Sequence, residues 1–263
     1  MPDVTHPLAA STRSEFFWTV RHSVKAILSD IHGNLGALNA VLEDVRNRGI
    51  DHVLCVGDIV GYGPNPGDCI EIVRQRANVS LTGNHDAGVA GLTSLEKFNE
   101  FARWAAEWSV AQLGAGQIAY LASLPYTHRE SGLLLVHASP LEPARWHYIH
   151  GRGLIAEHFA AFAENLCFVG HTHRTGIYAM RDGRYFVRKG EFENLRPDLR
   201  YLVNVGSVGQ SRDRDPRASY ALYDEAAGRI ELRRVTYPAE KTQARMRAAG
   251  FPNFLIDRLG TGV

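Results

Sequence analysis

The sequence reads Ser29-Asp30-Ile31-His32-Gly33-Asn34 directly after a short apolar run, Val24–Leu28. The run contains β-branched side chains and ends at polar residues, so it predicts a strand. Apolar residues then recur at helical spacing from Leu35 to Val45, and Gly49 marks the end of the predicted helix. A strand that stops at a polar turn and leads into a helix is typical of a layered α/β domain.

The same unit is repeated further along the chain. One predicted strand ends in Gly57-Asp58, and the next ends in Gly83-Asn84-His85-Asp86. Between them, the turn-rich loop Gly61–Gly67 leads into a predicted helix at Asp68–Arg76. This alternation of strands and helices favours an α/β domain with parallel strands.

The remainder of the chain predicts further helices and then mostly strands. We expect continuous helix over residues 94–123 and a shorter helix at Leu154–Ala163. Two short helices are expected within Pro238–Val263. The other expected strands are His52–Val56, Asn78–Leu81, Tyr126–Arg129, Leu133–Val136, Leu166–Val169, Ile177–Arg181, Tyr185–Lys189, Arg200–Val205, Ala218–Asp224 and Arg229–Val235.

The composition excludes several classes of protein. Among the 263 residues, 29 basic and 28 acidic side chains leave a net charge of +1, which argues against a nucleic-acid coat or a polybasic membrane binder. No stretch reaches the ~20 apolar residues of a membrane span. Three widely spaced cysteines favour the reducing cytoplasm over a disulfide framework.

We expect a partly ordered extension over residues 1–22 and one domain with C-terminal helices over residues 23–263. Assembly into a homo-oligomer stays open.

Five predicted strand ends carry residues of the types that bind metals. Because sites in α/β sheets form beyond the carboxyl ends of strands, we expect these side chains to converge. Asp30 and His32 are two positions apart and can share one ion, and His171 and His173 have the same spacing. One ion takes four to six ligands, so seven candidates suit two divalent ions with a shared carboxylate. The seven are Asp30, His32, Asp58, Asn84, His137, His171 and His173.

Each candidate also has an ordinary structural interpretation. Asp58 alone could cap the next helix, Asn84 alone could be a turn residue, and a single histidine such as His137 is usually structural. The recurrence at five strand ends favours the metal interpretation. Mixed imidazole and carboxylate ligands suit Mn, Fe, Zn or Ni better than Mg or Ca.

Taken together, the motifs at the five predicted strand ends resemble those of the calcineurin-like metallophosphoesterase superfamily. The resemblance covers about residues 24–235. The sequences of residues 57–64 and 204–210 look like those of the bacterial YfcE-like branch, which includes proteins described as diadenosine tetraphosphate hydrolase-like. It implies an α/β (α+β) fold: a four-layer α/β/β/α sandwich of two mixed β-sheets flanked by helices. The matching blocks, in order, are Asp30-x-His32, Gly57-Asp58, Gly83-Asn84-His85-Asp86, His137 and Gly170-His171-x-His173.

The resemblance also implies a role for each candidate. It assigns the first metal to Asp30, His32 and His173. It assigns the second metal to Asn84, His137 and His171, with Asp58 bridging both.

His85 holds the place of the catalytic histidine in that family. The protein-phosphatase branch follows its Gly-Asp with a further Asp, Arg and Gly, where this chain has Gly61-Tyr62-Gly63. The Asp that would orient the histidine is therefore missing, and we expect Asp86 to take its place as a third catalytic residue beside His85 and Asp58. The missing Arg argues against a phosphoprotein phosphatase.

Substrate contacts are expected from loops beside these strand ends. Tyr62 lies in the turn after Asp58, and Ser207 follows a predicted strand. The run 211–217 carries three arginines, including Arg212; it is either a solvated loop with internal ion pairs or a clamp for phosphate. With Asn84 and His85, these residues form the expected substrate set. A purine could stack on Trp146, Tyr148 and Tyr62, although aromatic residues are more often core.

Three functions stay open from the sequence. The first is hydrolysis of dinucleoside polyphosphates such as diadenosine tetraphosphate. The second is a phosphodiesterase of broad specificity or for cyclic nucleotides. The third is a non-catalytic interaction module on the same fold, which would be expected to lose ligands, whereas all seven candidates and His85 are present. The expected partner is a small phosphoester or nucleotide, with no membrane and no nucleic acid.

Overall fold

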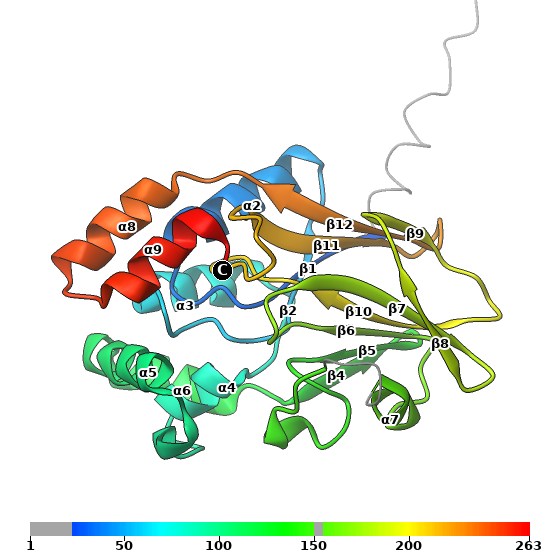
Figure 1. Cartoon of the computed structure of the whole chain (residues 1–263), viewed down its shortest axis with the longest axis horizontal. Helices are drawn as coiled ribbons and strands as arrows, with labels where there is room; N and C mark the ends of the chain where they lie inside the picture. The colour runs from blue at the N-terminus through cyan, green and yellow to red at the C-terminus, as the bar shows by residue number, and fades with distance from the viewer. Residues whose placement is uncertain (1–22, 150–154) are drawn as a thin grey trace, which may run out of the picture.

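Two six-stranded mixed sheets form the centre of the molecule (Figure 1). The computed structural model describes residues 23–149 and 155–263, so the expected extension over residues 1–22 lies outside the described residues. The first sheet has the order β3-β2-β1-β11-β12-β9 and the second β4-β5-β6-β10-β7-β8. The strands are β1 Val24–Leu28, β2 His52–Cys55, β3 Val79–Ser80, β4 Thr127–Glu130, β5 Leu133–Val136, β6 Leu166–Val169, β7 Thr175–Arg181, β8 Arg184–Arg188, β9 Phe192–Asn194, β10 Arg200–Val205, β11 Ala218–Asp224 and β12 Arg229–Val235.

Parallel pairing is confined to the strands that precede the candidate ligands and their immediate neighbours. β1 pairs with β2 and β2 with β3 in parallel, and β6 pairs in parallel with both β5 and β10. The remaining pairs are antiparallel, including β1 with β11 and β10 with β7. The carboxyl ends of β1, β2 and β3 therefore lie at one edge of the first sheet, and those of β5 and β6 at one edge of the second.

Helices cover the outer faces of the two sheets. The helices are α2 Leu35–Asn47, α3 Pro66–Arg76, α4 Asn84–Val89, α5 Glu100–Gln112, α6 Ala115–Ser123, α7 Ile155–Ala160, α8 Ala239–Ala248 and α9 Asn253–Thr261, with short 3₁₀ turns at Leu95–Lys97 and Pro143–Arg145. No helix of the described residues is long and apolar enough to cross a membrane.

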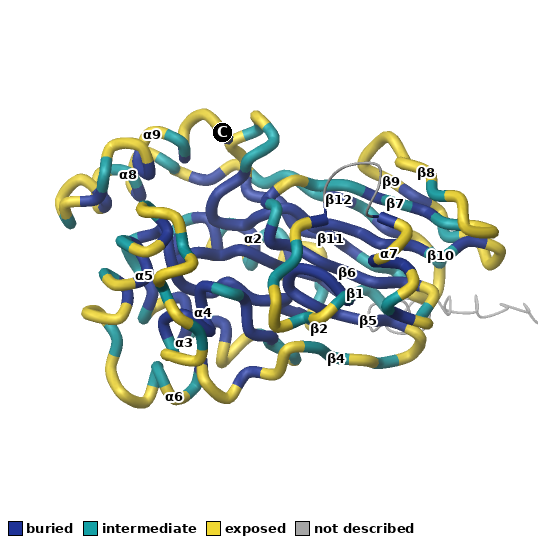
Figure 2. Tube along the Cα trace, turned by 60° about the horizontal axis from the view of Figure 1, so that its bottom comes forward, coloured by how far each residue is buried: buried dark blue, intermediate teal, exposed yellow. Residues whose placement is uncertain are grey.

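Alternation along the strands produces four layers. In β1, Ala26 and Leu28 pack with the helix α2, whereas Ile27 between them packs in the cluster between the two sheets. In β5, Leu135 joins that inner cluster, and Leu134 faces the opposite side, where α7 packs. Figure 2 shows the buried strands of both sheets beneath partly exposed helices. The expected four-layer α/β/β/α sandwich is confirmed.

Several local expectations were wrong. The helix expected over residues 94–123 is divided into the 3₁₀ turn Leu95–Lys97, α5 and α6. Asn99 starts α5 by accepting a hydrogen bond from the backbone N–H of Ala102 at 2.9 Å, and Gly114 starts α6. The short helix α4 and the three-residue edge strand β9 were not expected, because neither is long enough to carry a periodic pattern.

The C-terminal helices pack beside α2 and α5. Thr242 of α8 donates a hydrogen bond to Asn34 at 3.1 Å, immediately before α2. Met246, Leu255 and Leu259 belong to one apolar cluster with Tyr62 and with residues of α5. The helices α8 and α9 therefore form part of the wall around the loop that follows β2.

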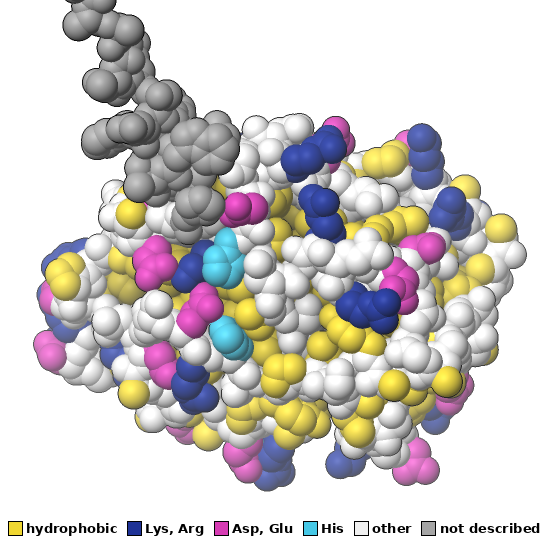
Figure 3. Space-filling model, turned by 180° about the vertical axis from the view of Figure 1, so that it is seen from behind, with side chains coloured by type: hydrophobic (Ala, Val, Ile, Leu, Met, Phe, Trp, Pro, Cys, Tyr) yellow, Lys and Arg dark blue, Asp and Glu magenta, His cyan; other side chains and the backbone are white. Residues whose placement is uncertain are grey.

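The outer surface carries charges of both signs. On the face seen in Figure 3, basic and acidic side chains are interspersed, and apolar atoms lie between them. This pattern agrees with the net charge of +1 and forms no continuous basic field on that face.

Candidate metal centre

The backbone at the strand ends adopts a conformation that is costly for these residues. Asp30, His32, Asp58, His171 and His173 all have φ between 50° and 66°, in the left-handed region that non-glycine residues rarely enter. Such residues persist only where the surrounding structure fixes them, and they cluster at functional sites. Five of the seven predicted ligands share this feature.

The strand ends are fastened to each other by backbone hydrogen bonds. The N–H of Asp30 donates to the carbonyl of Gly57 at 3.0 Å, and that of His32 donates to the carbonyl of Asp58 at 2.9 Å. The N–H of His85 donates to Oδ1 of Asp58 at 2.8 Å. The turns after β1, β2 and β3 therefore form one connected unit.

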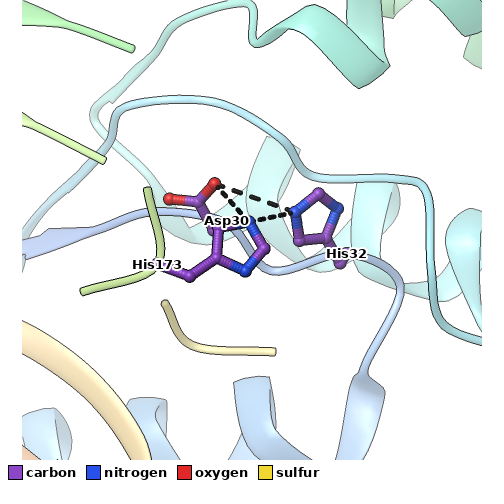
Figure 4. Close-up of side chains that lie close together, drawn as sticks. All are labelled: Asp30, His32 and His173. Atoms are coloured by element: carbon purple, nitrogen blue, oxygen red, sulfur yellow. Dashed lines mark hydrogen bonds and ion pairs between the residues drawn. The ribbon is translucent and has the colours of Figure 1, made fainter. Parts of the chain in front are cut away.

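The first cluster consists of Asp30, His32 and His173 (Figure 4). Nε2 of His173 lies 3.2 Å from Oδ1 of Asp30, and the Nε2 atoms of His32 and His173 lie 3.0 Å apart. Nδ1 of His32 donates to the carbonyl of Val60 at 2.9 Å, and Nδ1 of His173 donates to the carbonyl of Gln210. These bonds place the proton on Nδ1 and leave the Nε2 lone pairs facing Asp30, as in many metal sites.

The second cluster consists of Asp58, His137 and His171. Nε2 of His137 lies 3.3 Å from Oδ2 of Asp58, and its Nδ1 donates to the carbonyl of Val56 at 2.9 Å. The same Oδ2 lies 3.5 Å from Nε2 of His32 in the first cluster. Asp58 therefore faces both clusters with one oxygen.

Four buried atoms of the candidate ligands have no hydrogen-bond partner. A buried polar atom without a partner is unfavourable, so each requires an explanation. All four are nitrogen or oxygen atoms of types that bind divalent transition metals. The residues present therefore fit divalent ions. The atoms are Oδ1 of Asp30, Oδ1 of Asn84, Nε2 of His137 and Nε2 of His171.

The electrostatics keep the carboxylates ionised. Burial raises the pKa of Asp30, but the positive charge of His173, followed by that of His137, outweighs it and lowers the pKa overall. Burial lowers the pKa of His137, but the charges of Asp58 and Asp30 outweigh it and raise the pKa to about 9. Burial lowers the pKa of His171 to about 3. The carboxylates thus attract positive charge to this position.

His85 lies between the two clusters and an aromatic wall. Its ring centroid is 4.9 Å from that of His32, 4.6 Å from that of Tyr62 and 5.0 Å from that of Phe98. Its Nδ1 is buried without a partner, and one of its ring nitrogens lies within 4.8 Å of ligand atoms of His32 and Asp58. Burial lowers its pKa to about 4. His85 is therefore a neutral imidazole at the edge of the centre.

The expected pairing of Asp86 with His85 was wrong. Oδ1 of Asp86 accepts hydrogen bonds from the N–H groups of Ile59 and Val60 at 2.9 and 3.1 Å, and Oδ2 accepts from Gly83 at 3.0 Å. The carboxylate caps α4 and holds the loop that follows Asp58. It has no hydrogen bond to His85, whose ring is instead packed by aromatic neighbours.

The expected substrate contact of Ser207 is also corrected. Ser207 is fully buried, and its hydroxyl donates to the carbonyl of Asp30 at 2.8 Å while accepting from the N–H of Gln210 at 2.8 Å. Ser207 therefore supports the turn that carries Asp30 and does not reach the surface of the centre.

The arginines of residues 211–217 differ in their surroundings, and the expected solvated loop and the expected phosphate clamp each fit some of them. Arg217 forms an ion pair with Asp215, as a solvated loop would. Arg212 turns toward the centre: its guanidinium carbon lies 5.4 Å from the ring of Tyr62, which itself packs 4.7 Å from the ring of His32. The structure thus brings Tyr62 and Arg212 to the rim of the first cluster.

A cavity of about 240 Å³ opens beside the second cluster. Tyr148 lies over His171 with ring centroids 4.1 Å apart, and Trp146 has a left-handed backbone at φ 57° with a buried, unpartnered Nε1. The expectation did not include Phe98 or Lys97, because helical spacing alone does not show which side chains of residues 94–123 reach a strand end. The lining includes Asn84, His85, His171, Tyr62, Lys97, Phe98, Trp146 and Tyr148.

The chain is similar to known proteins over most of its length. Uncharacterized protein MJ0912 of Methanocaldococcus jannaschii is 38% identical over 250 residues, which cover 91% of this chain and 98% of that protein. The crystal structure of a metallophosphoesterase from Sphaerobacter thermophilus is 43% identical, with a TM-score of 0.80, and the match covers 92% of this chain and 100% of that one. Hypothetical protein PH1004 from Pyrococcus horikoshii OT3 shares the fold at a TM-score of 0.74 and 20% identity, over 91% of this chain and 98% of that one.

A family model decides the wider assignment. The calcineurin-like phosphoesterase superfamily domain matches residues 25–228, a range that includes both clusters and His85. This match confirms the resemblance drawn from the strand-end motifs. The chain belongs to the calcineurin-like phosphoesterase superfamily and is a metal-dependent phosphoester hydrolase.

Proposed function

We propose that this protein uses two divalent ions, one at each cluster, to hydrolyse phosphodiester or phosphoanhydride bonds of small nucleotides. The observation that carries this proposal is the position of Asp58. One of its oxygens lies 3.5 Å from Nε2 of His32 and 3.3 Å from Nε2 of His137. A carboxylate that faces both clusters is the arrangement that a shared ligand requires.

The two clusters would divide the candidate ligands between the two ions. Mn, Fe, Zn or Ni would suit the mixed nitrogen and oxygen donors. When bound, two such ions make water nucleophilic at neutral pH and offset negative charge on the phosphoryl group. The first ion would be held by Asp30, His32, Asp58 and His173, and the second by Asp58, Asn84, His137 and His171.

His85 would act on the substrate rather than as a ligand. A neutral imidazole carries one N–H, and the rings of Tyr62 and Phe98 hold this one in place. His85 would donate a hydrogen bond to a phosphoryl oxygen or a proton to the leaving oxygen. Groups in this role contribute about 10²–10⁴-fold to the rate.

The cavity beside the second cluster favours a small nucleotide as substrate. Tyr148 and Trp146 offer aromatic faces for a base, and Trp146 also offers an unpartnered N–H donor. Lys97 lies on the same wall and could meet a further phosphate.

A substrate panel tests the proposal. Protein stripped with a chelator and reloaded with Mn²⁺ is assayed with bis(p-nitrophenyl) phosphate, diadenosine tetraphosphate and 2′,3′- and 3′,5′-cyclic nucleotides, with product analysis. We expect metal-dependent hydrolysis of the diester and of at least one nucleotide. Hydrolysis confined to cyclic nucleotides would favour the phosphodiesterase alternative. A folded, Mn²⁺-loaded protein that hydrolysed none of them would favour the non-catalytic module.

A further inference from the structure

Asn204, near the end of β10, is hydrogen-bonded to the turn that carries two of the candidate ligands. Its side chain is buried, and its Nδ2 donates to the carbonyl of Gly170 at 2.7 Å and to Oγ1 of Thr172 at 3.0 Å. Its Oδ1 accepts from the backbone N–H of Gly206 at 3.0 Å. Three hydrogen bonds of one amide therefore fasten the turn of residues 170–173 to the end of β10.

This turn needs support because its backbone is strained. His171 and His173 have φ of 66° and 58°, a region that non-glycine residues keep only where the surrounding structure fixes them. His173 belongs to the first cluster and His171 to the second. A small rotation of the turn would therefore move one candidate ligand atom in each cluster.

The chain that follows β10 also contacts the turn of the first sheet. The carbonyl of Asp30 accepts from the N–H of Gly209 at 2.9 Å and from the hydroxyl of Ser207 at 2.8 Å. The carbonyl of Gln210 accepts from Nδ1 of His173. One short segment thus holds the turns of Asp30 and His173, which come from different sheets, in a fixed relation.

We propose that Asn204 is a positioning residue for the metal centre, because it sets the turn from which His171 and His173 present Nε2 to the two ions. This inference rests on the two-ion centre of the proposed function and adds a residue outside the candidate ligand set. Residues that orient the ligands in this way are typically worth about 10–100-fold in metal affinity. An apolar side chain of the same size would fill the space but would leave the carbonyl of Gly170 without its donor.

Mn²⁺ binding by two substitutions of Asn204 tests this role. Protein stripped with a chelator is titrated with Mn²⁺ by isothermal titration calorimetry. Asn204→Ala removes all three hydrogen bonds, whereas Asn204→Asp keeps the acceptor and loses both donors. We expect the Mn²⁺ affinity to fall by about 10–100-fold in each variant. The aspartate is the sharper test, since its added negative charge would by itself tighten the binding of dications.

Thermal melting separates a positioning role from a purely structural one. Bound Mn²⁺ raises the melting temperature by an amount that depends on its affinity, so loss of a positioning residue should reduce this rise. Loss of a purely structural residue would lower the melting temperatures of stripped and loaded protein equally. Thr172→Val removes one of the three bonds of Asn204 and should show a smaller reduction. It keeps the test available if Asn204→Ala does not fold.

The controls are Asn78→Ala and Asn78→Asp. Oδ1 of Asn78 accepts from the backbone N–H of Val53 at 2.9 Å, and the residue precedes the amino end of β3, away from the strand ends that carry the candidate ligands. These variants remove a comparable hydrogen bond or add the same charge. We expect their Mn²⁺ affinity to stay within about 2-fold of the wild type, because exposed charges at a distance are screened.

The outcomes separate this inference from the proposed function. Wild-type Mn²⁺ affinity in both Asn204 variants, or equal losses in the Asn78 variants, would overturn the positioning role. A wild type that bound no Mn²⁺ would overturn the two-ion centre and this role with it. A protein that binds Mn²⁺, loses affinity in the Asn204 variants and hydrolyses no substrate would support the positioning role and contradict the enzyme.

Discussion

The carboxylate of Asp30 accepts a hydrogen bond from the backbone N–H of His171, with Oδ2 2.9 Å from the nitrogen. The same oxygen accepts from Oγ of Ser29 at 2.6 Å. Its other oxygen, Oδ1, is left for the first cluster. One side chain thus fixes the turn of the second sheet and presents an oxygen to the first cluster, so a change near it should affect the geometry and the metal binding together.

Gly170→Ala should test this close approach. An added Cβ would overlap Oγ of Ser29 and Oδ2 of Asp30, so the turn that carries His171 must shift. We expect lower thermal stability, measured with and without metal. We also expect weaker binding in a titration of the metal-free protein with Mn²⁺. Gly116→Ala in α6 is the control, because nothing lies within 4 Å of its added Cβ. Unchanged metal affinity in Gly170→Ala would show that the turn can yield at little cost.

Asp58→Asn should nearly abolish turnover and weaken metal binding. The amide keeps the shape of the side chain but removes the charge that would hold two dications close together. We expect kcat to fall by ~10²-fold or more, and elemental analysis to find less metal per chain than in the wild type. Wild-type turnover in this variant would remove Asp58 from the centre.

His85→Ala and Asn84→Ala should separate chemistry from metal binding. His85→Ala is expected to lower kcat by ~10²-fold or more with both ions retained. Asn84→Ala is expected to lose the second ion first, because its buried Oδ1 has no other partner. The two residues are adjacent, so kcat and metal content must be measured on the same samples. If His85→Ala lost metal as readily as Asn84→Ala, His85 would be a ligand.

Asp44 should contribute a pH-dependent part of the stability. Its Oδ2 accepts from the hydroxyl of Tyr220 at 2.6 Å and from Nε of Arg233 and Arg48 at 3.0 and 3.1 Å. Burial raises its pKa, but these bonds outweigh it and lower the pKa overall. The contribution is therefore present above the unfolded pKa of about 3.9 and is lost as the pH falls through the lower folded pKa.

Urea unfolding of Asp44→Asn measures this contribution. At pH 7 we expect a loss of about 1–2 kcal/mol relative to the wild type, and a difference that shrinks as the pH falls below about 4. Glu43→Gln is the control, since its ion pair with Arg46 is highly exposed. Both variants are measured after chelation, so that metal release does not contribute. A loss that stayed constant down to pH 3 would assign the effect to packing rather than charge.

The positions of the candidate ligands could be predicted because their geometry is set by the strands. Asp30, Asp58 and His137 follow apolar runs that are easily recognised, and parallel neighbours bring such ends to one edge. At these positions the local sequence signal and the pairing of distant strands predict the same placement. The two mixed sheets were expected because the strand-end motifs resemble a family with that fold.

The roles of other polar residues depended on contacts that no local pattern contains. The carboxylate of Asp86 is occupied by amides 26 and 27 positions earlier in the chain, and the hydroxyl of Ser207 by a carbonyl 177 positions away. Because such distant partners decide where a loop side chain points, the sequence alone could not predict the roles of these residues.

The candidate ligands come from both sheets, and this has a consequence for folding. Asp30, Asp58 and Asn84 follow strands of the first sheet, whereas His137 and His171 follow strands of the second. Ions bound among them would act as a reversible crosslink between two halves that are otherwise joined by loops and an apolar interface. Chelation should then accelerate amide hydrogen exchange at the ends of β1 and β6 together, and the separation of the two sheets should become the easiest route by which the protein opens.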